Sequence, residues 1–181
     1  SKAYSKLARM LGSDRLEFAH QEIDTENAAR FLAFQGRPLH EFGRAALLLF
    51  ALERLPAEEQ MEFIDELFMR GDSREQEALL RTLSLLPDAG RFLATAVEAC
   101  RANVQTVFEA IACENPYPSC YFPESNFNQL VLKAIFIGMS LQRIVGLSDR
   151  VTPALKGMVS DHIKERTAAG LPVHEDVALI M

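Results

Sequence analysis

The sequence predicts an all-α fold of about 8 to 10 helices, arranged as a compact α-α superhelix or an irregular multi-helix bundle. Apolar residues recur at spacings of three and four along nearly the whole chain, and the segments with this spacing end at Gly or Pro. No run alternates apolar and polar residues for long enough to form a strand. With 181 residues, the chain is most simply one all-helical domain, residues 1–181.

The first part of the chain contains amphipathic segments separated by breaks. Residues 2–11 and 14–34 are predicted as two helices, and the Gly36-Arg37-Pro38 break ends the second of them. Leu39–Leu55 is the next predicted helix. Its apolar block, residues 45–52, is so dense that we expect burial on most sides of this helix.

The two following helices begin with recognisable caps. Pro56 opens the first of them, where its missing N–H is harmless, and the helix continues to Gly71. Asp72 or Ser73 is expected to cap the second. Glu75 lies near the third helical position, so the pattern resembles a capping box.

The chain then approaches a connector rich in proline. Pro87 stops the previous helix, and Asp88 is predicted to cap another that extends to about Ala102. Because the turns between these helices are short, neighbours are expected to pack antiparallel. A helix over Val104–Glu114 follows. The connector Asn115-Pro116-Tyr117-Pro118 is predicted to be extended and stiff, since a residue before Pro is displaced from helical geometry.

The helix after the connector, Asn126–Met139, is strongly apolar, so each of its few polar residues needs an explanation. A buried ammonium without a partner is very costly. Lys133 is therefore expected either at a surface slit or facing a carboxylate. Glu109 and Glu114, from the preceding helix, are the candidates for that carboxylate.

Three interpretations of this region are open. In the first, four polar side chains satisfy the irregular backbone of the connector: Asn115, Asn128, Gln129 and Lys133. Whatever the function, Asn128→Ala is expected to destabilise the fold more than a surface substitution does, through unsatisfied backbone groups. In the second, the polar residues floor a pocket whose walls are Tyr117, Tyr121, Phe122, Phe127 and Cys120. In the third, the region is an exposed surface that binds a partner.

The C-terminal part contains one long predicted helix. Thr152 caps it, Pro153 opens it, and Gly170 ends it. Asp161 and Glu165 are four residues apart on this helix, and an exposed acidic face is expected there rather than half of a metal site.

Composition excludes several classes of function. The net charge of −6 argues against nucleic acid as the main partner, and the longest apolar runs are too short to cross a bilayer. The N-terminus does not resemble a signal peptide. The three cysteines form no CxxC pair and have no metal-ligand spacing, which predicts reduced thiols in a cytoplasmic protein without a metal or cofactor.

Several sequence words resemble the EboA-domain family over about residues 39–173. They are NPYP (115–118), YFPE (121–124), FNQLVLKA (127–134), RIVGL (143–147) and ERTAAGLPV (165–173), and the helices RAALLLFAL (44–52) and LLRTLSLLPDA (79–89) are similar in style. The resemblance implies a role in making or exporting a small metabolite, in gene clusters with prenyltransferase-like and TIM-barrel-type enzymes. It implies no catalytic residue. The chain departs from the family's usual tail, since it contains no Trp and has Thr152 where the family has Asn.

Two function hypotheses follow. The first is a non-enzymatic adaptor that binds partner enzymes of a metabolite pathway through exposed helix faces, which fits a chain without HExxH, DDxxD or GxSxG motifs. The second is a small-molecule carrier or enzyme whose pocket lies beside the connector. There, Lys133 or Asn128 would orient an apolar ligand, and the residues available for chemistry would be Glu109, Glu114 and Cys120.

Overall fold

A computed structural model describes residue 34 and residues 36–181, and over these residues the all-α prediction is confirmed. The α-helices are α3 (Leu39–Leu52), α4 (Ala57–Arg70), α5 (Ser73–Thr82), α6 (Leu93–Ala99), α7 (Gln105–Ala112), α8 (Tyr117–Tyr121), α9 (Glu124–Phe136) and α10 (Pro153–Ala168). The 3₁₀ turns are η2 (Leu83–Leu85), η3 (Ala89–Phe92), η4 (Leu141–Arg143), η5 (Ser148–Arg150) and η6 (Glu175–Leu179). The helices predicted over 2–11 and 14–34 lie outside the described residues, apart from Phe34.

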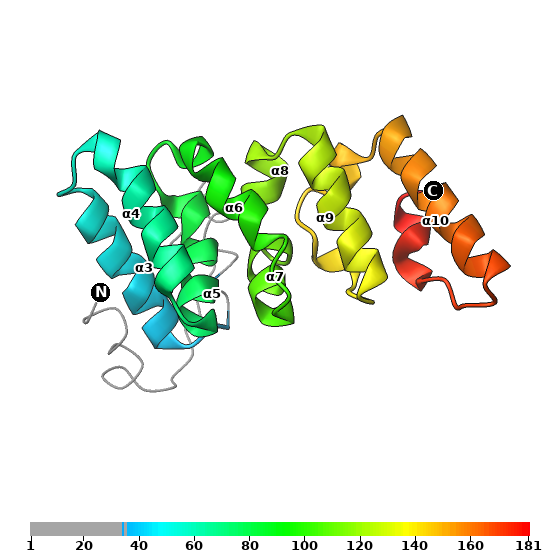
Figure 1. The fold of residues 1–181 in the computed structure, drawn as a ribbon, viewed down its shortest axis with the longest axis horizontal. Helices are drawn as coiled ribbons and strands as arrows, with labels where there is room; N and C mark the ends of the chain where they lie inside the picture. The colour runs from blue at the N-terminus through cyan, green and yellow to red at the C-terminus, as the bar shows by residue number, and fades with distance from the viewer. Residues whose placement is uncertain (1–33, 35) are drawn as a thin grey trace, which may run out of the picture.

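The helices form two layers that extend along the chain. Helix α5 packs against α3 on one side and α7 on the other, while α4 packs against α6. This contact between alternate helices is the pattern of an α-α superhelix, the first of the two predicted arrangements. Figure 1 shows the consequence: from α3 to α10 the helices follow one another along the longest axis of the molecule. The array ends where α10 packs against α9 and η6 packs against η4.

Among the described α-helices, side-chain caps fix the start of α5 and of α10. The predicted capping box of α5 is confirmed: Asp72 Oδ1 accepts from Glu75 N at 2.9 Å, and Glu75 Oε2 accepts from Asp72 N at 3.2 Å. Gly71 ends α4, where a Cβ atom would lie 2.8 Å from the carbonyl oxygen of Leu67. Thr152 caps α10 as predicted, with Oγ1 accepting from Leu155 N at 3.3 Å.

The first predicted helix of the described region is shorter and less buried than expected. It ends at Leu52, not Leu55. Gln60 Nε2 donates to the carbonyl oxygens of Leu52, at 2.8 Å, and Leu55, at 2.9 Å, and so replaces the backbone donors that a longer helix would supply. The expectation that α3 is buried on most sides was wrong. Its buried residues form one stripe along the helix, and Phe50 is 53% exposed. The guanidinium of Arg54 lies 3.3 Å above the Phe50 ring, so a charged side chain covers this apolar surface.

The predicted cap at Asp88 was also wrong. Asp88 makes no capping hydrogen bond, because its φ of 48° places it in the left-handed region, whereas a capping residue typically has an extended backbone. The predicted helix to Ala102 is instead the 3₁₀ turn η3 followed by the short α6, which ends at Ala99. This turn places Gly90 against α8.

The main apolar core is a connected cluster that runs from Leu48 in α3 to Ile180 near the C-terminus, and Phe34 and Ala45 form a small second cluster. Its largest fully buried side chains include Leu79 in α5, Phe108 in α7 and Phe127 in α9. In the described part of the chain, no helix has the length and hydropathy that a membrane crossing requires.

Candidate functional site

The connector is helical where it was predicted to be extended. Pro116 has φ −75° and ψ −12°, and Tyr117–Tyr121 forms the short helix α8. The prolines are tolerated because they lie at the start of a helix, where backbone N–H groups have no intrahelical acceptor. Asn115 Oδ1 accepts from Tyr117 N at 3.0 Å and so replaces a missing backbone partner. The backbone becomes extended after α8, at Phe122 and Pro123, and no peptide bond among the described residues is cis.

Asn115 and Tyr117 hold the connector in the core. The side chain of Asn115 is 1% exposed, and its Nδ2 donates to Leu80 O at 3.1 Å and to Ala110 O at 2.9 Å. The hydroxyl of Tyr117 donates to Ala89 O at 2.7 Å, and burial raises the pKa of this phenol. These contacts join α8 to α5, α7 and η3.

Lys133 faces neither predicted carboxylate. Its Nζ donates to Cys100 O at 2.6 Å and to Ala102 O at 2.8 Å, and lies 4.6 Å from the centroid of the Phe108 ring. Cys100 is the C-cap residue of α6, at the negative end of the helix dipole, and Ala102 lies in the turn beyond it, so both carbonyls are suitable partners for a cation. The expectation that Glu109 or Glu114 pairs with Lys133 was wrong for this reason.

Glu109 and Glu114 bind Arg143 instead. The guanidinium donates to both carboxylate oxygens of Glu114, at 2.7 and 2.9 Å, and also to Glu109. These hydrogen bonds raise the pKa of Arg143, with the contact to Glu114 the largest cause. Arg143 was not among the predicted site residues. Its only sequence signal is its place at the start of the RIVGL word, which does not indicate a partner.

Asn128 and Gln129, two further predicted site residues, make no hydrogen bond to the connector in the described part of the chain. Asn128 is 3% exposed, and its buried Oδ1 atom has no hydrogen-bond partner. It therefore does not satisfy the connector as the structural interpretation assumed, and Asn115 has that role. Gln129 lies on the exposed side of α9.

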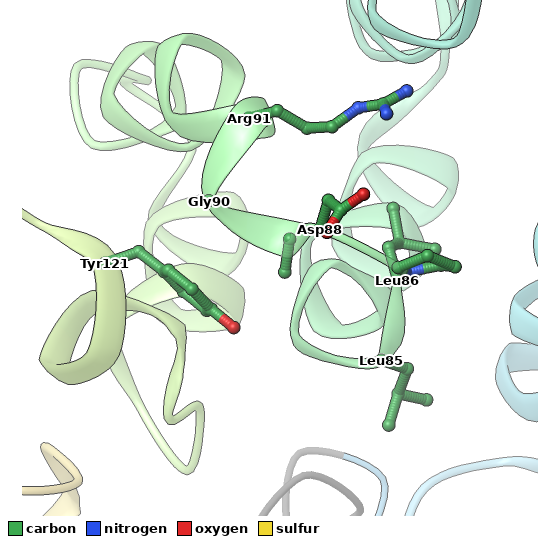
Figure 2. A pocket seen from close by; sticks show the side chains of 8 residues that line it. Leu85, Leu86, Asp88, Gly90, Arg91 and Tyr121 are labelled. Carbon is green, nitrogen blue, oxygen red and sulfur yellow. The ribbon is translucent and has the colours of Figure 1, made fainter. Parts of the chain in front are cut away.

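Tyr121 lines a hollow of about 710 Å³ that does not include Lys133. This Tyr121 hollow is formed with the turn from Leu85 to Arg91. Figure 2 shows Tyr121 facing that turn while Arg91 extends away from it. A Cβ atom on Gly90 would lie 3.2 Å from the Tyr121 ring, so the turn approaches the ring closely. Arg91 Nη2 instead donates to Ala57 O at 2.9 Å and Gln60 Oε1 at 2.7 Å.

Two further hollows border Lys133. The α6–α9 hollow, about 360 Å³, is lined by Val97, Cys100, Arg101, Phe122, Asn126, Gln129, Leu130 and Lys133. The α9–α10 hollow, about 570 Å³, is lined by Leu132, Lys133, Phe136, Met158, Asp161, His162 and Glu165. The predicted pocket walls are therefore separated: Phe122 lines the first of these hollows, Tyr121 lines its own, and Tyr117 and Phe127 are fully buried. Cys120 is exposed.

The buried thiols are not activated. Burial raises the pKa of Cys100 and of Cys113 to about 12, and the nearby cations Lys133 and Arg143 only partly oppose this effect. Both are therefore neutral thiols at physiological pH, and only a thiolate is a good nucleophile. Within the described residues, no group of three or more His, Cys, Asp or Glu side chains is placed to hold a metal ion.

The fold and these contacts define an all-helical α-α superhelix protein whose central connector is tied into the core by its own polar side chains. The whole chain, residues 1–181, matches the family described as Metabolite traffic protein EboA, and the protein belongs to this family. The match includes the N-terminal 38 residues, which the sequence words did not cover. No curated protein and no solved structure matches the chain.

Proposed function

We propose that the protein is a non-enzymatic adaptor in metabolite traffic, which binds a partner protein at the α9–α10 hollow. The observation that supports this proposal most directly is Phe136, which is 73% exposed at the end of α9. Beside it lie Leu132 and Met158, the latter 39% exposed. An apolar patch with a polar rim is typical of a protein-binding surface.

The charge around this patch indicates the chemistry of the partner. Asp161 and Glu165 of α10 lie on the rim, and the chain has a net charge of −6. Lys133 also lines the hollow, but its ammonium is bound to the carbonyls of Cys100 and Ala102, so the two carboxylates are the charges available to a partner. Asp161 is paired with Lys164 at 2.9 Å, but both side chains are more than two-thirds exposed, and such surface pairs contribute little. The partner is therefore expected to present an apolar side chain flanked by Lys or Arg. The apolar side chain of the partner would insert beside Phe136, and its basic side chains would lie next to Asp161 and Glu165 at the rim.

The test is purification of the protein from its own host, identification of a stoichiometric partner, and calorimetric titration of the two purified proteins. Phe136→Asp should weaken binding by about tenfold or more, because it places a charge at the centre of the apolar patch. Glu165→Lys should weaken binding and reduce its salt dependence. Phe50→Asp is the matched control, since Phe50 is also exposed but lies on α3 at the other end of the array. A host preparation without any stoichiometric protein, or equal binding by Phe136→Asp and Phe50→Asp, would overturn the proposal.

A further inference from the structure

The charged side chains that line the α6–α9 hollow are all positive. Its charged lining residues are Lys133 and Arg101, and none of the residues that line it is acidic. Arg101 is exposed and donates to Glu98 Oε2 at 2.8 Å, so its charge is partly neutralised outside the hollow. Lys133 is therefore the main source of positive charge inside.

The protein holds the ammonium of Lys133 in a fixed position. An ammonium has three N–H donors, and two hydrogen bonds, to the carbonyls of Cys100 and Ala102, fix its place. One donor remains for a ligand at the edge of the hollow. The amides of Asn126 and Gln129, also in the lining, supply further donors. Donors held in place before binding lower the entropy that a ligand must lose.

The remaining walls of the α6–α9 hollow are apolar: Val97, Phe122 and Leu130. Cys100 adds a thiol that stays neutral at physiological pH. A ligand that fits here needs an apolar body next to its anionic group, because neither a bare inorganic ion nor a pure hydrocarbon would match both parts of the lining.

A second hollow extends this site along α6. It measures about 790 Å³ and shares Val97, Arg101 and Asn126 with the first, so the two adjoin. Its apolar residues include Phe68 and Met69 of α4, and Met69 is 71% exposed. Two carboxylates, Asp65 and Glu98, also line it. An anionic group is thus repelled from the α4 end and attracted to the α9 end, which sets a direction for the ligand.

We propose that the groove along α6 binds a small amphipathic anion, with a carboxylate or phosphate at Lys133 and an apolar chain directed toward Phe68 and Met69. The ammonium would donate its free N–H to the anion. The chain would cover Val97 and Leu130. This site does not depend on the partner protein proposed above, because it is formed within one chain by α4, α6 and α9.

The test is calorimetric titration of the purified full chain with octanoate and with octyl phosphate, which separates the two anionic groups. Octylamine is the matched cationic probe and butanoate the short one. Octanoate or octyl phosphate should bind with a stoichiometry of one, and octylamine about tenfold more weakly or not at all. Butanoate should bind more weakly than octanoate, because it cannot reach the apolar part of the groove.

Gln129→Glu is the decisive variant, since it places a carboxylate beside Lys133 at an exposed position where folding is not at risk. It should weaken octanoate binding about tenfold through like-charge repulsion. Gln105→Glu, at an exposed position at the start of α7, is the matched control and should bind octanoate as the wild type does. Equal affinity for octanoate and octylamine, equal binding by Gln129→Glu and Gln105→Glu, or no binding of either anion would overturn the proposal. None of these results depends on whether a protein partner is found.

Discussion

Lys133 Nζ lies 2.6 Å from the carbonyl oxygen of Cys100, although the two residues are 33 positions apart in the sequence. This contact joins the last turn of α9 to Cys100, the C-cap residue of α6. The same ammonium also binds Ala102 O, so one side chain satisfies two carbonyls in the turn that leads to α7. The polar residue that the sequence marked for a ligand or a carboxylate thus also stabilises the packing between helices.

The first prediction concerns this contact. Lys133→Met keeps the length of the side chain but leaves both carbonyls without their donor, and should lower the free energy of unfolding by about 2–3 kcal/mol. Urea denaturation followed by circular dichroism measures the change. Lys156→Met is the control, because exposed Lys156 binds only the carbonyl of Met181, and should change stability by less than about 0.5 kcal/mol. Equal effects of the two substitutions would contradict this account of Lys133.

The second prediction compares two buried asparagines. Asn115→Leu removes three hydrogen bonds and leaves the carbonyls of Leu80 and Ala110 without this donor, so it should lower the free energy of unfolding by about 3 kcal/mol or more. Asn128→Leu has nearly the same shape but removes an oxygen that has no partner, and should change stability by less than about 1 kcal/mol. Thermal melts of both variants measure this difference. A larger loss for Asn128→Leu than for Asn115→Leu would restore the role first expected of Asn128.

Local signals in the sequence were sufficient for most of the fold. The capping box at Asp72 and Glu75 and the Thr152-Pro153 start of α10 are confirmed, because each depends on contacts within one turn. The prediction of an extended connector was wrong because its conformation depends on a side-chain contact that the local rule does not include. The rule that a residue before Pro is extended considers only the local backbone. In the protein, Asn115 Oδ1 accepts a hydrogen bond from Tyr117 N, which stabilises the helical turn.

The site was less predictable because its contacts are distant in sequence. Arg143 binds Glu114 across 29 positions, and nothing in either neighbourhood indicates the pairing. Lys133 was correctly recognised as a residue that needs a partner. The partner is a pair of helix-end carbonyls, and a sequence pattern gives no means of choosing these over the acidic residues nearby.

The third prediction concerns pH. Burial raises the pKa of Cys100 and Cys113 to about 12, whereas a thiol in the unfolded chain ionises near pH 8.5. Since the folded pKa is the higher one, this stabilisation is fully present below about pH 8.5 and is lost as pH rises toward 12. The free energy of unfolding should therefore fall between pH 8 and pH 10.5, and the fall should be smaller in the Cys100→Ala, Cys113→Ala double variant. The same pH dependence in both proteins would contradict the prediction.

A thiol reagent provides a separate check on burial. It should modify exposed Cys120 first in the folded protein.

The fourth prediction concerns Arg143, which joins the end of α7 to η4. Its guanidinium makes a two-point contact with Glu114 and a further one with Glu109, and Glu114 N also donates to Arg143 O at 2.8 Å. Arg143→Met leaves two carboxylates close together without their shared cation, and the cation that remains is Arg37, whose Nη2 lies 3.9 Å from Glu114 Oε2. It should lower the free energy of unfolding by about 1–2 kcal/mol in low salt, because a two-point arginine contact is stronger than an ordinary surface pair.

Salt separates this explanation from a simple loss of packing. In 1 M NaCl the Debye length is about 3 Å, so repulsion between Glu109 and Glu114 in the variant is screened and the deficit of Arg143→Met should shrink. Glu109→Gln should recover part of the lost stability in the Arg143→Met background, since it removes one of the two like charges. Arg70→Met is the matched control, because Arg70 makes only one exposed contact, to Glu66 at 3.1 Å, and should change stability by less than about 0.5 kcal/mol at either salt concentration. If the Arg143→Met deficit is independent of salt and of Glu109, the side chain stabilises this junction through its apolar stem and not through its charge.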